Sequence, residues 1–198
     1  MGICVQRNSF ITWNKESGEP LHNFITWKDK RSQQLCDVWN SSYTLSAARG
    51  LGSFLSLLTM KGPQWETLKN FHFKPAHTSI RLAWAIENVD KLKETLKKSP
   101  SNVCFGCVDT WIVWKLTGGK TWAAEHSCLS TTGMYDAYDA GDWHKLILKL
   151  LKIPTTILPS IVDTVSKQYG ETDQKSIGHA IPITAVVRLI LVCLSNSK

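Results

Sequence analysis

The stretch FGCVDTWIVWKLTGGK, residues 105–120, contains the clearest change from strand to helix in the chain. The apolar run that ends at Phe105 and Gly106 predicts the end of a buried strand. Asp109 then stands where a carboxylate can accept the first free N–H groups of a helix, and Gly118 supplies the left-handed residue that ends one. We therefore predict a strand–helix unit and interpret Asp109 as a helix cap rather than a catalytic carboxylate.

Other segments of the chain have the periodicity of strands. The β-branched and aromatic runs at residues 9–13 and 23–27 flank a turn with Gly and Pro, which predicts a β-hairpin. Residues 2–6 predict another strand, and residues 181–187 predict a buried one. Strands that alternate with helices are typical of an α/β layered domain.

Three segments have the periodicity of helices. Residues 30–40 carry their apolar side chains on one side. Over residues 78–99, apolar side chains recur at spacings of three and four, which predicts one continuous amphipathic helix. In GDWHKLILKLLKIP, Asp142 is the predicted cap and Pro154 ends the helix. The pattern of residues 40–75 is mixed and predicts no element.

The composition is that of a globular protein, with 43% hydrophobic and 20% charged residues among 198. The net charge of +7 would suit a phosphate-rich partner, yet the basic residues are scattered, and acidic residues interrupt their densest cluster at residues 91–99. A nucleic-acid-binding domain is therefore the least favoured function. The last apolar run contains Arg188 and is short for a bilayer, so we expect no membrane span.

Six cysteines are spread through a chain that shows no signal-peptide pattern, which favours a reducing, cytoplasmic compartment. Cys104 and Cys107 have CxxC spacing, but no second pair follows at a zinc-site distance. The favoured interpretation is two small half-buried residues, and a redox or metal site is the alternative. No two histidines have metal-ligand spacing, so no metal site is predicted.

Five stretches follow one another along the chain: CVQRNSFITWNKESGEPLHNFITWKDKR, FGCVDTWIVWKLTGG, STTGMYDAYDAGDWHKLILKLLKIPTTILP, YGET and IPITAVV. Together they resemble the N-terminal half of glycerol kinases of the FGGY carbohydrate-kinase family. The resemblance implies an α/β fold, an incomplete ribonuclease-H-like (actin-like ATPase) domain whose first strands are missing. This domain would cover residues 1–187, and residues 188–198 would form a divergent tail.

The resemblance also implies an ATP-dependent kinase that transfers phosphate to glycerol, with Mg²⁺ and ATP held mainly by a second domain. By this resemblance, Arg7 stands where the family's arginine binds a glycerol hydroxyl. Asn8 replaces the glutamate that follows it, and Trp27 matches the aromatic wall against the carbon chain. The family's tyrosine falls at Ala76, so that contact would be lost.

The resemblance fails at the catalytic position. Counting from IPITAVV places the family's general-base aspartate at Leu189, which cannot accept a proton. The family's Asp-x-Gly-Thr phosphate-binding hairpin is also absent from the chain. We therefore expect a truncated, inactive glycerol-kinase-like chain that has no catalytic residue and binds neither ATP nor Mg²⁺ alone. The alternative is a non-catalytic polyol-binding or regulatory interaction protein. The sequence predicts no oligomeric state.

Overall fold

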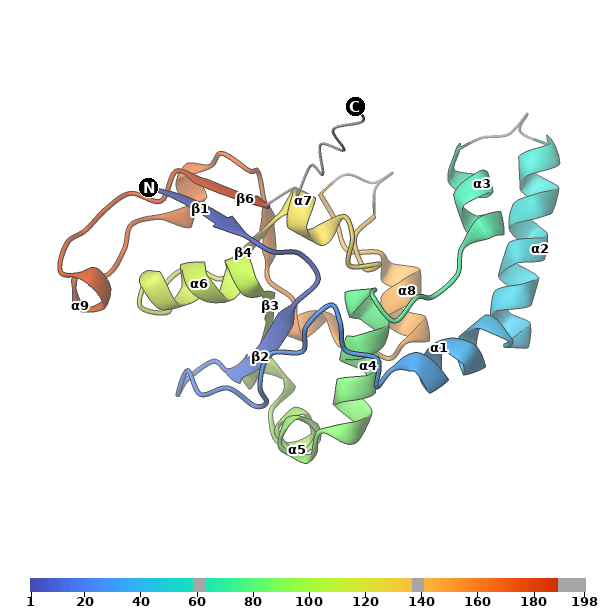
Figure 1. Cartoon of the computed structure of the whole chain (residues 1–198), viewed down its shortest axis with the longest axis horizontal. Coiled ribbons are helices and arrows are strands. Elements are labelled where there is room, and N and C mark those ends of the chain that lie inside the picture. Colours follow the sequence, from blue (N-terminus) through green and yellow to red (C-terminus); the bar gives the residue numbers. More distant parts are fainter. Residues whose placement is uncertain (59–62, 137–140, 189–198) are drawn as a thin grey trace, which may run out of the picture.

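The computed structural model describes residues 1–58, 63–136 and 141–188, and Figure 1 shows how their elements are arranged. In chain order the elements are β1 (Gly2–Val5), β2 (Phe10–Asn14), α1 (Gln33–Asn40), α2 (Tyr43–Leu58), α3 (Pro63–Asn70), α4 (Thr78–Asn88), α5 (Asp90–Lys98), η1 (Pro100–Asn102), β3 (Val103–Cys107), α6 (Val108–Leu116), β4 (Ala123–Glu125), α7 (His126–Leu129), α8 (Lys145–Leu150), η2 (Thr155–Ile157), β5 (Ser160–Val162), η3 (Lys167–Tyr169), α9 (Gln174–Ile177) and β6 (Ala185–Arg188). Strands alternate with helices, as the α/β prediction requires.

The strands pair two by two in the described part of the chain. β1 runs parallel to β6, and β4 runs parallel to β5. β2 runs antiparallel to β3, with Phe10 opposite Cys107 and Trp13 opposite Cys104. The β1–β6 pair joins the two ends of the described chain to each other, and the β2–β3 pair joins its N-terminal part to its middle.

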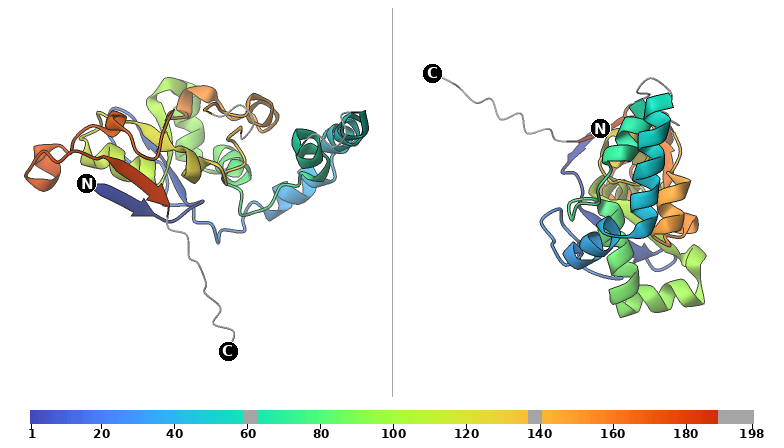
Figure 2. Two further views of the ribbon diagram at one scale, coloured as in Figure 1. Left: turned by 90° about the horizontal axis from the view of Figure 1, so that it is seen from above. Right: turned by 90° about the vertical axis from the view of Figure 1, so that its right-hand side faces the viewer.

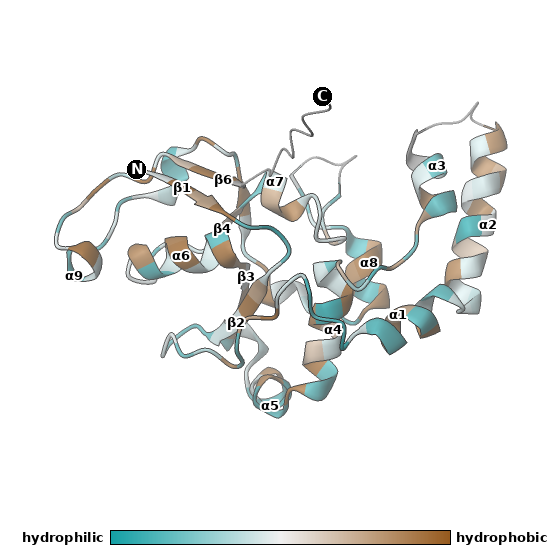
Figure 3. Ribbon diagram, in the orientation of Figure 1, coloured by the Kyte–Doolittle hydropathy of each residue, from teal (hydrophilic) through white to brown (hydrophobic). Residues whose placement is uncertain are grey.

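The β2–β3 pair is buried on both faces. Phe10 and Phe105 belong to the large hydrophobic cluster formed with α4 and α5, and their ring centroids lie 5.6 Å apart. Trp13 and Cys104 point to the opposite face and pack with Trp114 of α6. In Figure 3 the brown, hydrophobic residues lie on β3 and on parts of β2 and α6, as well as on other elements such as β1 and β6. This pair is therefore the centre of the molecule, with a core on either side.

The strand–helix unit at residues 103–116 confirms the prediction from the opening stretch. β3 is buried throughout, and α6 follows it directly. Gly118 has a φ of 64° just after the helix, as a glycine that ends a helix should.

The predicted hairpin is confirmed only in part. Phe10 and Ile25 exchange two backbone hydrogen bonds, of 3.1 and 3.0 Å, in antiparallel fashion. However, residues 23–27 form only an isolated bridge to β2, and the main partner of β2 is β3. The apolar pattern identified the strand but not its partner, because many apolar segments can satisfy the same buried edge.

The prediction of one helix over residues 78–99 is wrong. α4 ends at Asn88 and α5 begins at Asp90, and Val89 between them is extended, with φ −103° and ψ 104°. Asn and Asp favour helix ends, and a β-branched residue tolerates the extended backbone. The break lets Leu92 of α5 reach the same core as Leu82 of α4.

The cap of α8 also differs from the prediction. The helix begins at Lys145, and the side chain of His144 accepts a hydrogen bond from the Ile147 amide. The Asp142 carboxylate instead accepts one from the neighbouring Trp143 amide at 2.7 Å. The helix begins too late for Asp142 to cap it.

Residues 40–75, for which the sequence predicted no element, contain two helices. α2 and α3 pack on each other and stand out from the strand-bearing body (Figures 1 and 2). Of α2, only Leu45, Gly52 and Ser56 are buried. Among the residues that the structure describes, no helix has the length and apolar character to cross a membrane.

Gly106 tests the packing between the β2–β3 pair and α6. A Cβ at this position would lie 2.8 Å from side-chain atoms of both Trp13 and Thr110. We expect Gly106→Ala to lower the free energy of unfolding by about 1–3 kcal/mol, since a packed core cannot yield to the extra methyl group. Chemical denaturation measures this loss.

The matched control is Gly50→Ala in α2, where the new Cβ would meet no atom within 4 Å. A glycine in an exposed helix costs about 0.5–1 kcal/mol relative to alanine, so this variant should gain stability. Equal effects of the two substitutions would contradict the packing argument.

Candidate functional site

The link between β1 and β2 contains the predicted residues Arg7 and Asn8. The Asn8 backbone is left-handed, with a φ of 58°, which Asn tolerates better than most residues. Its side-chain Oδ1 accepts a hydrogen bond of 2.9 Å from the Thr131 hydroxyl. This link is therefore tied to a distant part of the chain. The two N–H donors of the Asn8 side chain have no partner among the described residues.

The guanidinium of Arg81, in α4, lies where three segments meet. Nη2 donates to the carbonyl oxygens of Asn8 at 2.6 Å and Ala76 at 2.8 Å. Nη1 donates to the carbonyl of Ile25 at 3.4 Å and to that of Thr26. Nε donates to the His77 carbonyl at 3.4 Å. One side chain thus joins the backbone of residues 8, 25–26 and 76–77.

Arg81 is 1% exposed, and burial lowers the pKa of its guanidinium to about 10. It is still protonated at neutral pH. Burial, and then the charges of Lys74 and Arg81, lower the pKa of His77. The meeting point of the three segments therefore carries one buried positive charge.

The predicted ligand contacts stand beside this meeting point. Asn8 belongs to the first segment, Trp27 directly follows the second, and Ala76 belongs to the third. The Trp27 side chain is 49% exposed, and the Lys28 ammonium lies 5.2 Å from its ring. Arg7 is partly buried, and no hydrogen bond or ion pair joins its side chain to another described residue. We call Arg7, Asn8 and Trp27 the candidate wall.

Asp109 is not the cap of α6, and this prediction is wrong. The helix begins two residues earlier than predicted, at Val108, and Cys107 occupies the cap position without a side-chain hydrogen bond. Asp109 is 1% exposed, and neither carboxylate oxygen has a hydrogen-bond partner of good geometry. Burial raises the pKa of Asp109 to about 6, against smaller opposing effects of the nearby Thr110 and Glu125 amides.

The carboxylate that does cap a helix is Glu125, which the sequence analysis missed. It accepts hydrogen bonds from the amides of Ser127 and Cys128, at 2.8 and 2.9 Å. The Thr164 hydroxyl also donates to it, at 2.5 Å. Burial alone would raise the pKa of Glu125, but these hydrogen bonds outweigh burial and lower it. Glutamate is not among the residues preferred at helix caps, which explains why the sequence analysis missed it.

The other candidate groups of the sequence analysis, the cysteine pair and possible metal ligands, form no reactive or metal-binding site within the described residues. No group of three His, Cys, Asp or Glu side chains could hold a metal ion there. Cys104 and Cys107 are fully buried rather than half-buried, and burial raises the pKa of both thiols, which disfavours the reactive thiolate. Leu189, which the family resemblance predicts at the position of the general base, lies outside the described residues.

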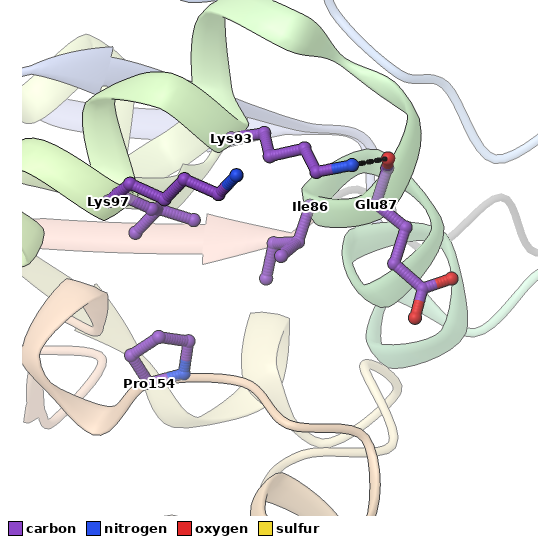
Figure 4. Close-up of a pocket in the computed structure, with 6 residues that line it drawn as sticks. Ile86, Glu87, Lys93, Lys97 and Pro154 are labelled. Carbon is purple, nitrogen blue, oxygen red and sulfur yellow. Dashed lines mark hydrogen bonds between the residues drawn. The ribbon is translucent and has the colours of Figure 1, made fainter.

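A hollow of about 290 Å³ lies between the end of α4, α5 and Pro154 (Figure 4). Its lining consists of Ile86, Glu87, Lys93, Leu96, Lys97 and Pro154. The candidate wall is not part of this lining, so the hollow is a separate feature of the surface.

Comparison with known proteins identifies relatives of the chain. The sequence profile described as the FGGY family of carbohydrate kinases, N-terminal domain, matches residues 55–187. Glycerol kinase 5 of Mus musculus is 38% identical over 187 residues, which are 94% of this chain and 34% of the relative. Glycerol kinase 5 of Homo sapiens is 37% identical over the same shares of both chains. Glycerol kinase of Petrotoga mobilis is 31% identical, over 94% of this chain and 33% of the relative.

Solved structures share the fold. The crystal structure of Plasmodium falciparum glycerol kinase with ADP has a TM-score of 0.75 and 23% identity, over 94% of this chain and 33% of that one. A crystal structure of a xylulose kinase from Brucella ovis has a TM-score of 0.63 and 16% identity, over 95% of this chain and 34% of that one. The chain therefore spans about a third of the length of these relatives.

The raised pKa of Asp109 predicts a pH-dependent stability. The folded chain binds this proton more tightly than the unfolded chain, whose pKa is near 3.8. The resulting stabilisation is fully present below about pH 4 and is lost as the pH rises to about 6. Asp109→Asn should therefore be more stable than the wild type at pH 7, by up to about 3 kcal/mol, and equally stable at pH 4.

Thermal unfolding of both proteins across this pH range measures the difference. Asp142→Asn is the control, because Asp142 is exposed and hydrogen bonds from the Trp143 amide and Lys145 lower its pKa. It should gain nothing at pH 7. An Asp109→Asn protein that is less stable than the wild type at pH 7 would contradict the prediction.

Proposed function

This chain belongs to the FGGY family of carbohydrate kinases, and we propose that it carries one wall of a polyol site of the glycerol-kinase type. The observation that carries the proposal is the junction at Arg81, where the backbone beside each predicted contact is joined to one buried guanidinium. The names of the relatives, glycerol kinase and glycerol kinase 5, support glycerol as the first polyol to test.

The candidate wall has the donors and the apolar surface that a small polyol needs. Arg7 offers a guanidinium and Asn8 an amide nitrogen, and both can donate to hydroxyl oxygens. The exposed indole of Trp27 offers a flat apolar surface to the carbon chain. The wall lacks an aromatic ring at Ala76, so we expect weaker contact with the ligand than in relatives that have a tyrosine there.

We infer that residues 1–198 do not transfer phosphate by themselves. Leu189 cannot act as the general base, a group that typically contributes about a hundred- to ten-thousand-fold to the rate. Among the described residues, no group of three or more His, Cys, Asp or Glu side chains could hold a metal ion. Phosphoryl transfer by the family, with ATP and Mg²⁺, would need groups beyond these residues.

A non-catalytic polyol-binding or regulatory interaction protein is the second candidate. Its support is the pair of predictions that the candidate wall contacts a polyol and that leucine stands at the general-base position. Both candidates predict polyol binding. They differ in whether a longer protein that contains these residues transfers phosphate. The domain boundary after residue 187 and the cytoplasmic location stay predictions.

The first experiment measures ADP release by purified residues 1–198 with glycerol, ATP and Mg²⁺. We expect no turnover above a contaminant control, because the sequence predicts neither a general base nor a nucleotide site to lower the barrier. Turnover that disappears in Arg7→Ala would show that the chain is an enzyme by itself.

The second experiment measures glycerol binding by NMR titration. We expect weak binding, since water competes for each hydroxyl on an open wall. Arg7→Ala should weaken it about fivefold, the effect of losing one hydrogen bond of about 1 kcal/mol. Lys98→Ala, which removes an exposed positive charge from the end of α5, is the matched control and should bind like the wild type. Equal weakening by both variants would point to net charge instead of a site.

A further inference from the structure

Arg81 differs from an ordinary surface arginine in how its donors are used. A guanidinium has five N–H donors. In this structure Nε has one carbonyl acceptor and each Nη has two, which makes five main-chain acceptors: His77, Ile25, Thr26, Asn8 and Ala76. Every donor of the buried group therefore has a main-chain partner.

The charge of Arg81 is balanced by dipoles rather than by a paired carboxylate. Its hydrogen-bond partners are neutral oxygens, and Asp29, which raises its pKa only through space, is itself paired with Arg31 at 2.6 Å. A buried cation is costly unless polar groups surround it. The guanidinium is therefore stable in this place only while the three segments keep their carbonyls directed at it, and the segments in turn depend on the guanidinium.

We propose that Arg81 is the positioning residue of the candidate wall: by holding the backbone of residues 8, 25–26 and 76–77 together, it places Arg7, Asn8 and Trp27 around one ligand. This inference rests on the proposed function. Arg81 itself has no donor left for a ligand, so its contribution to binding is indirect.

Arg81→Lys separates this role from that of charge. Lysine keeps the positive charge but has one nitrogen with three donors, so at least two of the five carbonyls lose their partner. The amides that report the junction are those of Phe10, Ile25 and His77, each hydrogen-bonded within or between the joined segments. The Thr117 amide, bonded to Val113 at the end of α6, reports the rest of the body.

The experiment is amide hydrogen exchange on the purified chain, followed by NMR. In Arg81→Lys we expect the amides of Phe10, Ile25 and His77 to exchange about tenfold faster or more, with the Thr117 amide unchanged, because only the junction opens. Arg49→Lys is the matched control, since Arg49 also donates to backbone carbonyls, those of Phe71 and Asn40, but beside α2 and α3. It should leave the three reporting amides as in the wild type.

A second measurement does not depend on the variant folding. In the wild type, a fully bonded guanidinium should give separately resolved and slowly exchanging N–H signals for Arg81. One averaged, rapidly exchanging signal would overturn the proposal. So would unchanged exchange at the three amides in Arg81→Lys, or a loss of protection at Thr117 equal to theirs.

Glycerol titration of the same proteins distinguishes this inference from the proposed function. If the wild type binds, Arg81→Lys should bind at least about fivefold more weakly and Arg49→Lys should bind equally well. Equal affinity of Arg81→Lys and the wild type overturns the positioning role. If the wild type does not bind glycerol, the proposed function fails for this polyol, and the role of Arg81 in placing that ligand fails with it. The hydrogen-exchange result still decides whether Arg81 holds the three segments together.

Discussion

The close approach of Trp13 and of Thr110 to Gly106 sets how near α6 can come to the β2–β3 pair. No side chain fits in this gap, because any Cβ on Gly106 would overlap atoms on both sides. With the gap closed, the ring of Trp114 packs against Trp13, and Trp111 stacks on Trp114 at an interplanar angle of 11°. One core of the molecule therefore exists because the central strand pair carries a glycine at this place.

The candidate wall is attached to the same strand pair. Asn8 lies just before β2, and Phe10, at the start of β2, exchanges backbone hydrogen bonds with Ile25. The Arg81 guanidinium lies 5.8 Å from the Phe10 ring. A shift of β2 would therefore move two of the three segments that meet at Arg81. The position of β2 therefore affects both the packing of the core and the geometry of the candidate wall.

The sequence could predict those features that local chemistry determines. The strand–helix unit at residues 103–116 follows from an apolar run, a helical period and a terminating glycine within one stretch. The partner of β2 could not be predicted, since apolar pattern does not choose between distant segments. Arg81 was missed for a related reason: in a helical pattern an arginine indicates solvent, and only the meeting of three distant carbonyl groups makes its burial favourable. The roles of Arg7, Asn8 and Trp27 rest on family resemblance, and the structure adds their placement.

The acceptors at Arg81 are main-chain oxygens, which every amino acid carries. Substitutions at positions 25, 26, 76 and 77 therefore keep the carbonyl partners of the guanidinium, whereas position 8 also has to keep its left-handed backbone. By the family resemblance, alanine replaces tyrosine at position 76, and this substitution leaves the Ala76 carbonyl bonded to Arg81. In evolution, the side chains that contact a ligand can therefore change while the backbone arrangement held by Arg81 is kept.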